Sequence, residues 1–352
     1  MERRYQKSVG YWLLSVAAMV FFMIIVGGLT RLTHSGLSMV EWRPLMGVLP
    51  PIGQAEWQDV FQKYQSSPEY QKINMGMSLE DFKQIFWFEY GHRILGRLIG
   101  LVFALPFAFF LIKRAISRSL LPKLILLFIL GGAQGVIGWW MVKSGLVDRP
   151  DVSHYRLTTH LGMAFLLYVA LLWTGLSQIR TNIQRNTNKS GLAALFLMVL
   201  IYGTVLSGGL VAGLDAGHQF NTFPLMNGQL IPDGLLVQEP WYINLTENIM
   251  TVQFNHRVLA ISTACITIAF YFWLGRQNLQ YRSQRLARHA LLLAVLLQVT
   301  LGITTLLSFV WVPVAAAHQS GATILLTMAT WLSHELFYVQ KTEMPAMSSA
   351  GK

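Results

Sequence analysis

Runs of mostly apolar residues recur along the whole chain and are separated by polar segments. A helix needs about 20 apolar residues to span the hydrocarbon core of a bilayer. The pattern therefore predicts an all-α polytopic membrane protein with eight transmembrane helices. The predicted helices are Tyr11–Leu29, His92–Ile112, Leu121–Val142, Leu157–Leu176, Leu192–Ala212, Asn255–Leu274, His289–Phe309 and His318–Val339.

The third predicted helix contains Gly131, Gly132, Gly135 and Gly138. Small residues let helices approach closely in membranes, so these glycines favour close helix contact rather than a break. The basic segment Met1–Lys7 leads into the first apolar run without a small-residue cleavage site, so we expect the first helix to be retained. No mitochondrial transit peptide is recognisable, and a bacterial cytoplasmic (inner) membrane is therefore expected.

Composition supports a lipid environment. Hydrophobic residues make up 53% of the chain, charged residues only 12%, and the mean hydropathy is +0.45. Soluble domains carry roughly 25% charged residues. Cys265 is the single cysteine and lies in the sixth predicted helix, which excludes an internal disulfide and a cysteine metal cluster.

The formal net charge of +11 is distributed unevenly. The N-terminus, the even-numbered loops and the C-terminal tail hold 16 of the 27 Lys and Arg but only three of the 16 Asp and Glu. Positive loops mark the cytoplasmic side of a membrane protein. We therefore expect both termini in the cytoplasm, and the charge gives no reason to expect a nucleic acid partner.

The chain also repeats itself. A shift of 164 residues aligns Glu89–Arg93 with Gln253–Arg257, and similar shifts align Gly27–Leu29 with Gly208–Leu210 and His160 with His318. This predicts two tandem four-helix bundles, residues 1–180 and 190–340, followed by a cytoplasmic tail, 341–352. Because each unit has an even number of helices, the bundles should be related by a pseudo-twofold axis along the membrane normal.

Four histidines occupy equivalent places in the two halves: His92 and His160 in the first, His256 and His318 in the second. The predicted boundaries place each of them near the outer end of its helix. Two imidazoles from facing helices of a bundle commonly ligate a haem iron. A hydrogen-bonded helix-end histidine explains one such residue, but the repetition favours haem ligation toward the outer face.

Glu89 lies one helical turn before His92, and its counterpart in the second half is Gln253. The two sites thus share a shape but differ in their ability to transfer a proton, which makes Glu89 a candidate catalytic residue. A solvated carboxylate at a helix start is the alternative. Arg93, Arg257 and, deeper, Arg97 are candidates to pair with haem propionates, with snorkelling to the interface as the alternative.

Several long loop runs, together with the histidine segments, resemble the haem A synthase family over nearly the whole chain. The matching segments are Gly27–Thr33, Ser35–Met39, Glu41–Pro44, Leu49–Pro51, Glu89–Arg97, Tyr155–Leu157, Phe220–Met226 and Phe254–Arg257. Without a cysteine pair in the outward loops, the chain is similar to the subgroup shared by proteobacteria and mitochondria.

The resemblance implies an oxidoreductase that converts haem O to haem A by two successive hydroxylations of a ring methyl group, giving a formyl group. It implies that His92, His160 and Glu89 serve the substrate haem O, and that His256 and His318 hold a permanent haem b. Haem O synthase as the haem donor and cytochrome oxidase assembly as the destination are implied partners.

Other interpretations stay open at this point. A bis-histidine b-type cytochrome that only transfers electrons explains the four histidines, but not the difference between Glu89 and Gln253. A transporter would need buried charge at mid-membrane, which the pattern does not provide. The electron partner, the source of the inserted oxygen, a homo-oligomeric state and the roles of His34 and His218 are not determined by the sequence.

Overall fold

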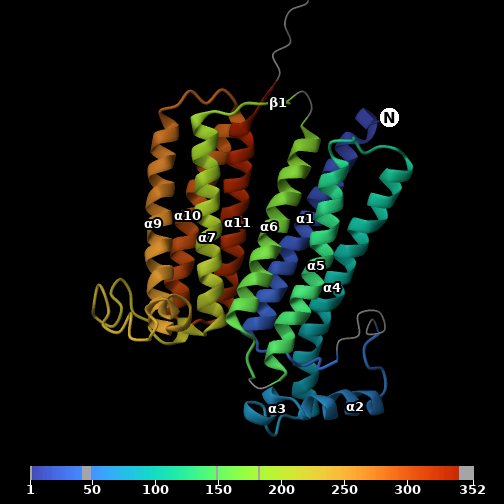
Figure 1. Cartoon of the computed structure of the whole chain (residues 1–352), viewed down its shortest axis with the longest axis vertical. Coiled ribbons are helices and arrows are strands. Elements are labelled where there is room, and N and C mark those ends of the chain that lie inside the picture. Colours follow the sequence, from blue (N-terminus) through green and yellow to red (C-terminus); the bar gives the residue numbers. More distant parts are fainter. Residues whose placement is uncertain (1, 42–48, 148–149, 181–182, 341–352) are drawn as a thin grey trace, which may run out of the picture.

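The computed structural model describes residues 2–41, 49–147, 150–180 and 183–340. The segment 341–352 and all of Glu41–Pro44 except Glu41 lie outside these residues. Eight long helices form the molecule: α1 (Glu2–Leu32), α4 (Leu79–Ile112), α5 (Leu121–Gly145), α6 (His154–Ile179), α7 (Lys189–Gly213), α9 (Ile249–Gly275), α10 (Arg282–Leu307) and α11 (Val312–Phe337). They run side by side, as Figure 1 shows.

Several helices begin earlier than the apolar pattern predicts, and in α4 and α9 a polar capping residue lies at the start, outside the apolar run. The Ser78 hydroxyl accepts from the Asp81 amide at the start of α4, and the Asn248 side chain accepts from two amides at the start of α9. α10 ends at Leu307, two residues before the predicted boundary. The four helices that carry the candidate histidines all begin at least six residues before them, so the histidines lie within helices rather than at their ends, which corrects the predicted placement.

The long helices contact one another in two similar sets. In the first, α1 and α5 each contact α4 and α6; in the second, α7 and α10 each contact α9 and α11. Between the sets, α6 contacts α7 and α11, and α1 contacts α11. Figure 1 shows the second set, in yellow to red, beside the first, in blue to green.

Two glycines of the repeated Gly-Gly-Leu segment make room for the contact between the sets. A Cβ on Gly28 of α1 would lie 2.1 Å from the Gln319 side chain of α11, whose amide donates to the Ile24 carbonyl at 2.6 Å. A Cβ on Gly209 of α7 would lie 3.1 Å from Thr158 Oγ1 of α6. Each glycine thus lets a helix of one set approach a helix of the other.

Among the described residues, seven of the eight long helices are long and apolar enough to cross a membrane. α11 is the remaining one. It is the helix with the most buried residues, among them His334 and Glu335, and it contacts α1, α6, α7 and α10. Because protein surrounds much of α11, its polar side chains meet polar partners instead of lipid.

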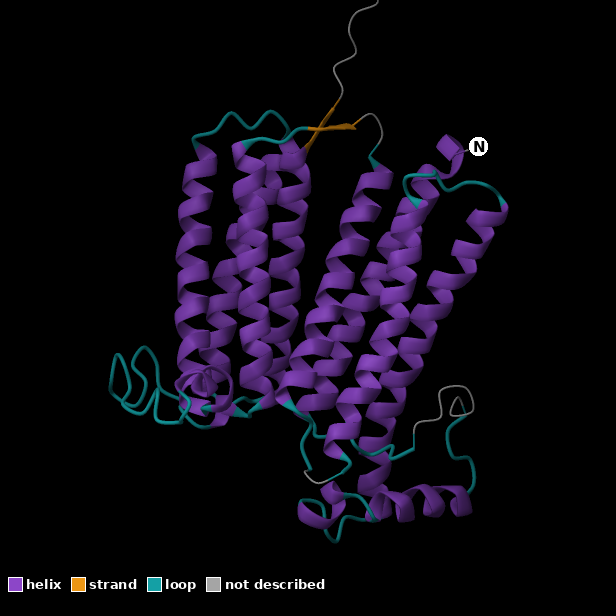
Figure 2. Ribbon diagram, viewed as in Figure 1, coloured by secondary structure: helices purple, strands orange, loops and turns teal. Residues whose placement is uncertain are grey.

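The loops divide between the two ends of the bundle (Figure 2). The short α4–α5 and α9–α10 connections lie at the end where the chain starts. There β1 (Ile183–Arg185) pairs antiparallel with β2 (Tyr338–Gln340), so this small sheet is an addition to the predicted all-helical architecture. At the other end lie α2 (Gln54–Gln65), α3 (Pro68–Lys72), η1 (Ala216–His218), η2 (Trp241–Ile243) and α8 (Asn244–Glu247).

The α2–α3 segment has a small core of its own. Trp57, Tyr64, Phe82 and Phe86 are buried together and attach α2 to the first turns of α4. Because this cluster packs on the first turns of α4, which precede the apolar run, Glu89 and His92 lie inside α4 and not at its exposed end.

Candidate haem-ligation sites

The structure brings the four candidate histidines together in two pairs. His92 of α4 lies near His160 of α6, and His256 of α9 lies near His318 of α11. All four side chains are partly exposed. Two imidazoles that approach each other from neighbouring helices have the arrangement used to ligate a haem iron on both sides.

Each of these imidazoles lies against a glycine of a neighbouring helix. A Cβ on Gly27 would lie 3.2 Å from His92 Nε2, and one on Gly138 would lie 3.0 Å from His160 Cε1. In the second half, a Cβ would lie 3.2 Å from His256 Cε1 at Gly208 and 2.8 Å from His318 Cε1 at Gly302. The glycines therefore provide the space in which the rings stand, and they do so at repeat-equivalent positions.

The predicted role of the glycines in the third helix is only partly confirmed. α5 is unbroken, but a Cβ on Gly131, Gly132 or Gly135 would meet nothing within 4 Å. Gly138 alone among the four makes a close approach, and its partner is a histidine ring.

His160 and His318 share part of their surroundings, but only the His318 imidazole has a backbone group, that of Gln298, within hydrogen-bonding reach. The Nδ1 atom of each is buried, and neither has a hydrogen-bond partner among the described residues. Gln134 of α5 donates to the His160 carbonyl at 3.1 Å. Ring nitrogens without protein partners are available to a ligand, whereas buried polar atoms are normally paired.

Glu89 is almost fully buried and accepts several hydrogen bonds. Its Oε2 accepts from the Ser38 hydroxyl at 2.7 Å and from the Met39 amide at 2.8 Å, and its Oε1 accepts from Arg93 Nε at 3.1 Å and from Arg93 Nη2. A carboxylate is an acceptor-only group that suits this set of donors. The carboxylate therefore connects α4 to the loop that follows α1.

Gln253, the counterpart of Glu89 in the second half, makes different hydrogen bonds. Its amide donates to the Phe220 carbonyl at 3.1 Å, while its Oε1 is buried with no partner in the part of the chain that the structure describes. The difference between Glu89 and Gln253 is therefore a difference in contacts as well as in charge.

The arginines that follow the histidines hold the outward loops. Arg93 donates to the Met39 carbonyl at 3.0 Å and the Glu41 carbonyl at 3.3 Å. Arg257 donates to the Phe220 carbonyl at 2.6 Å and the Thr222 carbonyl at 2.7 Å. In both halves the guanidinium thus binds two carbonyls two residues apart. The predicted propionate contacts of Arg93, Arg257 and Arg97 stay predictions.

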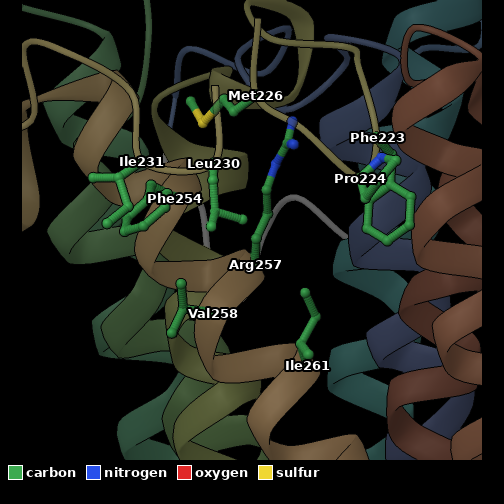
Figure 3. A pocket seen from close by; sticks show the side chains of 9 residues that line it. All are labelled: Phe223, Pro224, Met226, Leu230, Ile231, Phe254, Arg257, Val258 and Ile261. Carbon is green, nitrogen blue, oxygen red and sulfur yellow. The ribbon is translucent and has the colours of Figure 1, made fainter. Parts of the chain in front are cut away.

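A small cavity of about 220 Å³ lies beside Arg257 (Figure 3). Arg257 extends between Leu230 on one side and Pro224 on the other, while Val258 and Ile261 on α9 are about half exposed. Small-molecule sites are commonly roughly 300–1,000 Å³. This cavity is smaller, and none of the four histidines lines it. Its lining residues are Phe223, Pro224, Met226, Leu230, Ile231, Phe254, Arg257, Val258 and Ile261.

Two site residues escaped the sequence reasoning. Ser38 belongs to a loop segment that carried the family resemblance, but nothing in the sequence linked it to Glu89. Ser207 directly precedes the repeated Gly208-Gly209 pair, and its hydroxyl lies 2.7 Å from His256 Nδ1. Comparison of the residue before the glycine pair in the two halves would have found it, because the first half has Val26 there.

Taken together, these features define a multi-pass helical membrane protein with two equivalent histidine pairs and a carboxylate in one of them. Residues 10–330 match the family model described as "Cytochrome oxidase assembly protein". The "Heme A synthase" of Nitrosospira multiformis is 51% identical over 337 residues, which cover 94% of each chain. That of Nitrosomonas eutropha is also 51% identical, over 93% of each chain.

A third relative, the "Heme A synthase" of Parvibaculum lavamentivorans, is 46% identical over 94% of each chain. The chain therefore belongs to the haem A synthase family. The resemblance predicted from the loop segments and histidines is confirmed, and so is the expectation of a membrane oxidoreductase.

Proposed function

We propose that the protein oxidises a ring methyl group of haem O to a formyl group by two successive hydroxylations, as a haem A synthase working in cytochrome oxidase assembly. Membership of the family supports the conversion of haem O to haem A. The observation that carries the assignment of the site is the pair of equivalent histidine sites of which only one contains a carboxylate, Glu89.

We assign the substrate haem O to His92 and His160 and a resident haem b to His256 and His318. The four partly exposed imidazoles, the glycines that make room for them and the unpartnered Nδ1 atoms of His160 and His318 fit this assignment. When bound, haem b supplies one-electron transfer. The protein's own contribution is to ligate, to orient and to move protons.

Glu89 is the proposed proton carrier of the reaction. Its carboxylate lies one turn from His92, and the donors Ser38 and Arg93 hold it in place. In this position it can accept a proton released from the substrate methyl group or from an attacking water, or stabilise a developing positive charge. Arg93, Arg257 and Arg97 are the proposed partners of haem propionates.

The proposed topology has eight spans, with α11 as the eighth, and two bundles, residues 1–180 and 190–340, related by a pseudo-twofold axis. The similar contacts within each helix set and the paired contacts of α1 with α11 and of α7 with α6 support it. Both termini would face the cytoplasm and the histidine sites the outer side of a bacterial inner membrane, since the basic loops gather at one end. Haem O synthase is the proposed haem donor, and a homo-oligomer is compatible with this arrangement.

The test uses Glu89→Ala and Glu89→Gln, with Gln253→Ala as the matched control in the other half. The proteins are purified from cells that produce haem O, and the extracted haems are separated by chromatography and mass. We expect haem b and haem A in the wild type and in Gln253→Ala. Haem O or its alcohol should replace haem A in the Glu89 variants. Undiminished haem A in both Glu89 variants would exclude the proposed role. Haem b alone in the wild type would instead favour a bis-histidine electron carrier.

A further inference from the structure

The two halves differ in the residue that stands beside one of the two proposed ligand histidines. His160 and His318 share two features, a glycine at 3.0 and 2.8 Å and a buried Nδ1 atom, although only His318 approaches the backbone of Gln298. His92 and His256 do not match. The residue before the glycine pair is Ser207 near His256, whereas the first half has Val26 at the equivalent position.

The hydroxyl of Ser207 lies against one ring nitrogen of His256. The Ser207 hydroxyl lies 2.7 Å from the Thr204 carbonyl oxygen, which can only accept, and 2.7 Å from His256 Nδ1. Donation to that carbonyl engages the hydroxyl's single proton. With its proton engaged, the hydroxyl oxygen can only accept from the imidazole. In that arrangement His256 carries its proton on Nδ1, which leaves the Nε2 lone pair available for a metal.

The rings are also oriented differently against the glycines. His256 presents Cε1 to Gly208, with Nδ1 and Nε2 both 3.8 Å from the position of a Cβ. His92 presents Nε2 to Gly27 at 3.2 Å and Cδ2 at 3.6 Å. Val26 has an apolar side chain and offers no hydrogen bond that would set the rotation of the His92 ring.

We propose that Ser207 is a positioning residue that holds His256 with Nε2 toward the haem iron, so that the second half retains its haem, while Val26 leaves His92 free to turn and release the first-half haem. This inference rests on the proposed function. It explains how two sites of the same shape serve a retained cofactor and an exchanging substrate. A permanent haem gains from a fixed ligand, since outer partners of ligating histidines strengthen binding. A substrate haem that leaves as product requires a histidine ligand that can dissociate from the iron.

The experiment compares Ser207→Val, Ser207→Thr and the reciprocal Val26→Ser in the full-length protein. Two quantities are measured: the rate at which each haem transfers to excess apomyoglobin, and the midpoint potential of the haem b. For Ser207→Val we expect haem b to leave about 10- to 100-fold faster, with a more positive potential, because the imidazole loses the acceptor that makes it more electron-donating. Ser207→Thr keeps the hydroxyl and should stay near the wild type.

Val26→Ser provides an independent test that does not depend on the folding of Ser207→Val. It should slow the loss of the first-half haem and leave the potential of haem b unchanged. An unchanged transfer rate and potential in Ser207→Val, or faster loss in Val26→Ser, would overturn the inference. Failure of the proposed function can be told apart from failure of this inference, because full retention of haem b by His256→Ala would show that His256 is not a haem ligand.

Discussion

Replacing Gly302 with alanine provides a sharp test of the histidine sites. The added Cβ would lie 2.8 Å from His318 Cε1, and ordinary contact begins at 3.4 Å. The ring would have to move by about 0.6 Å, whereas ligand distances at metal sites are kept within about 0.2 Å. We therefore expect Gly302→Ala to displace His318 from the iron and to lose haem b.

The same substitution should leave the fold intact. Alanine is favoured over glycine within a helix by roughly 0.5–1 kcal/mol, and overpacking costs about 1–3 kcal/mol. The net change is thus at most about 2.5 kcal/mol of destabilisation. Haem affinity should fall by at least the roughly 10- to 100-fold that outer-shell changes produce, because here the ligand itself moves.

The assay measures haem b per protein after purification in detergent, together with the midpoint of thermal aggregation. Gly138→Ala is the repeat-equivalent variant, with a Cβ 3.0 Å from His160 Cε1, and it should lose the substrate haem while keeping haem b. Gly135→Ala is the control one turn away on α5, where a Cβ meets nothing within 4 Å. Full haem b occupancy in Gly302→Ala, or equal loss in Gly135→Ala, would refute the reasoning.

Two further predictions concern stability. Burial raises the pKa of the Glu69 carboxyl to about 7, and Tyr64 donates to it at 3.0 Å. The folded α2–α3 segment thus keeps a proton that the unfolded chain releases. Its stability should therefore fall as the pH rises from about 4.5 to 7, by on the order of 3 kcal/mol. Hydrogen exchange of residues 54–78 should show this pH dependence, and Glu69→Gln should lack it. Glu335 is 2% exposed and is bound by Arg180, Ser283 and Trp331. Glu335→Gln should lower the free energy of unfolding by about 3–5 kcal/mol, which a lower thermal midpoint would show. Asp215→Asn removes a half-exposed partner of Arg31 at 2.8 Å and should cost below about 1 kcal/mol; equal effects of the two variants would contradict the burial argument.

The sequence by itself determined the class of the protein and its repeated plan. Apolar runs long enough to span a bilayer require helices, since backbone groups in lipid must bond within their own segment. The internal repeat paired His92 with His256 and His160 with His318, and the substitution of Gln253 for Glu89 distinguished the halves. These are properties of residue order, so a linear reading was sufficient.

Tertiary structure decided where the helices begin and what each polar group contacts. The cap around Tyr64 and Phe82 extends α4 back to Leu79, an effect of packing between segments that no apolar pattern records. Helix α11 carries polar residues because other helices surround it. The bonds from Ser38 to Glu89 and from Ser207 to His256 join residues 51 and 49 positions apart. Their partners depend on which helix faces pack together, and only the folded chain defines those faces.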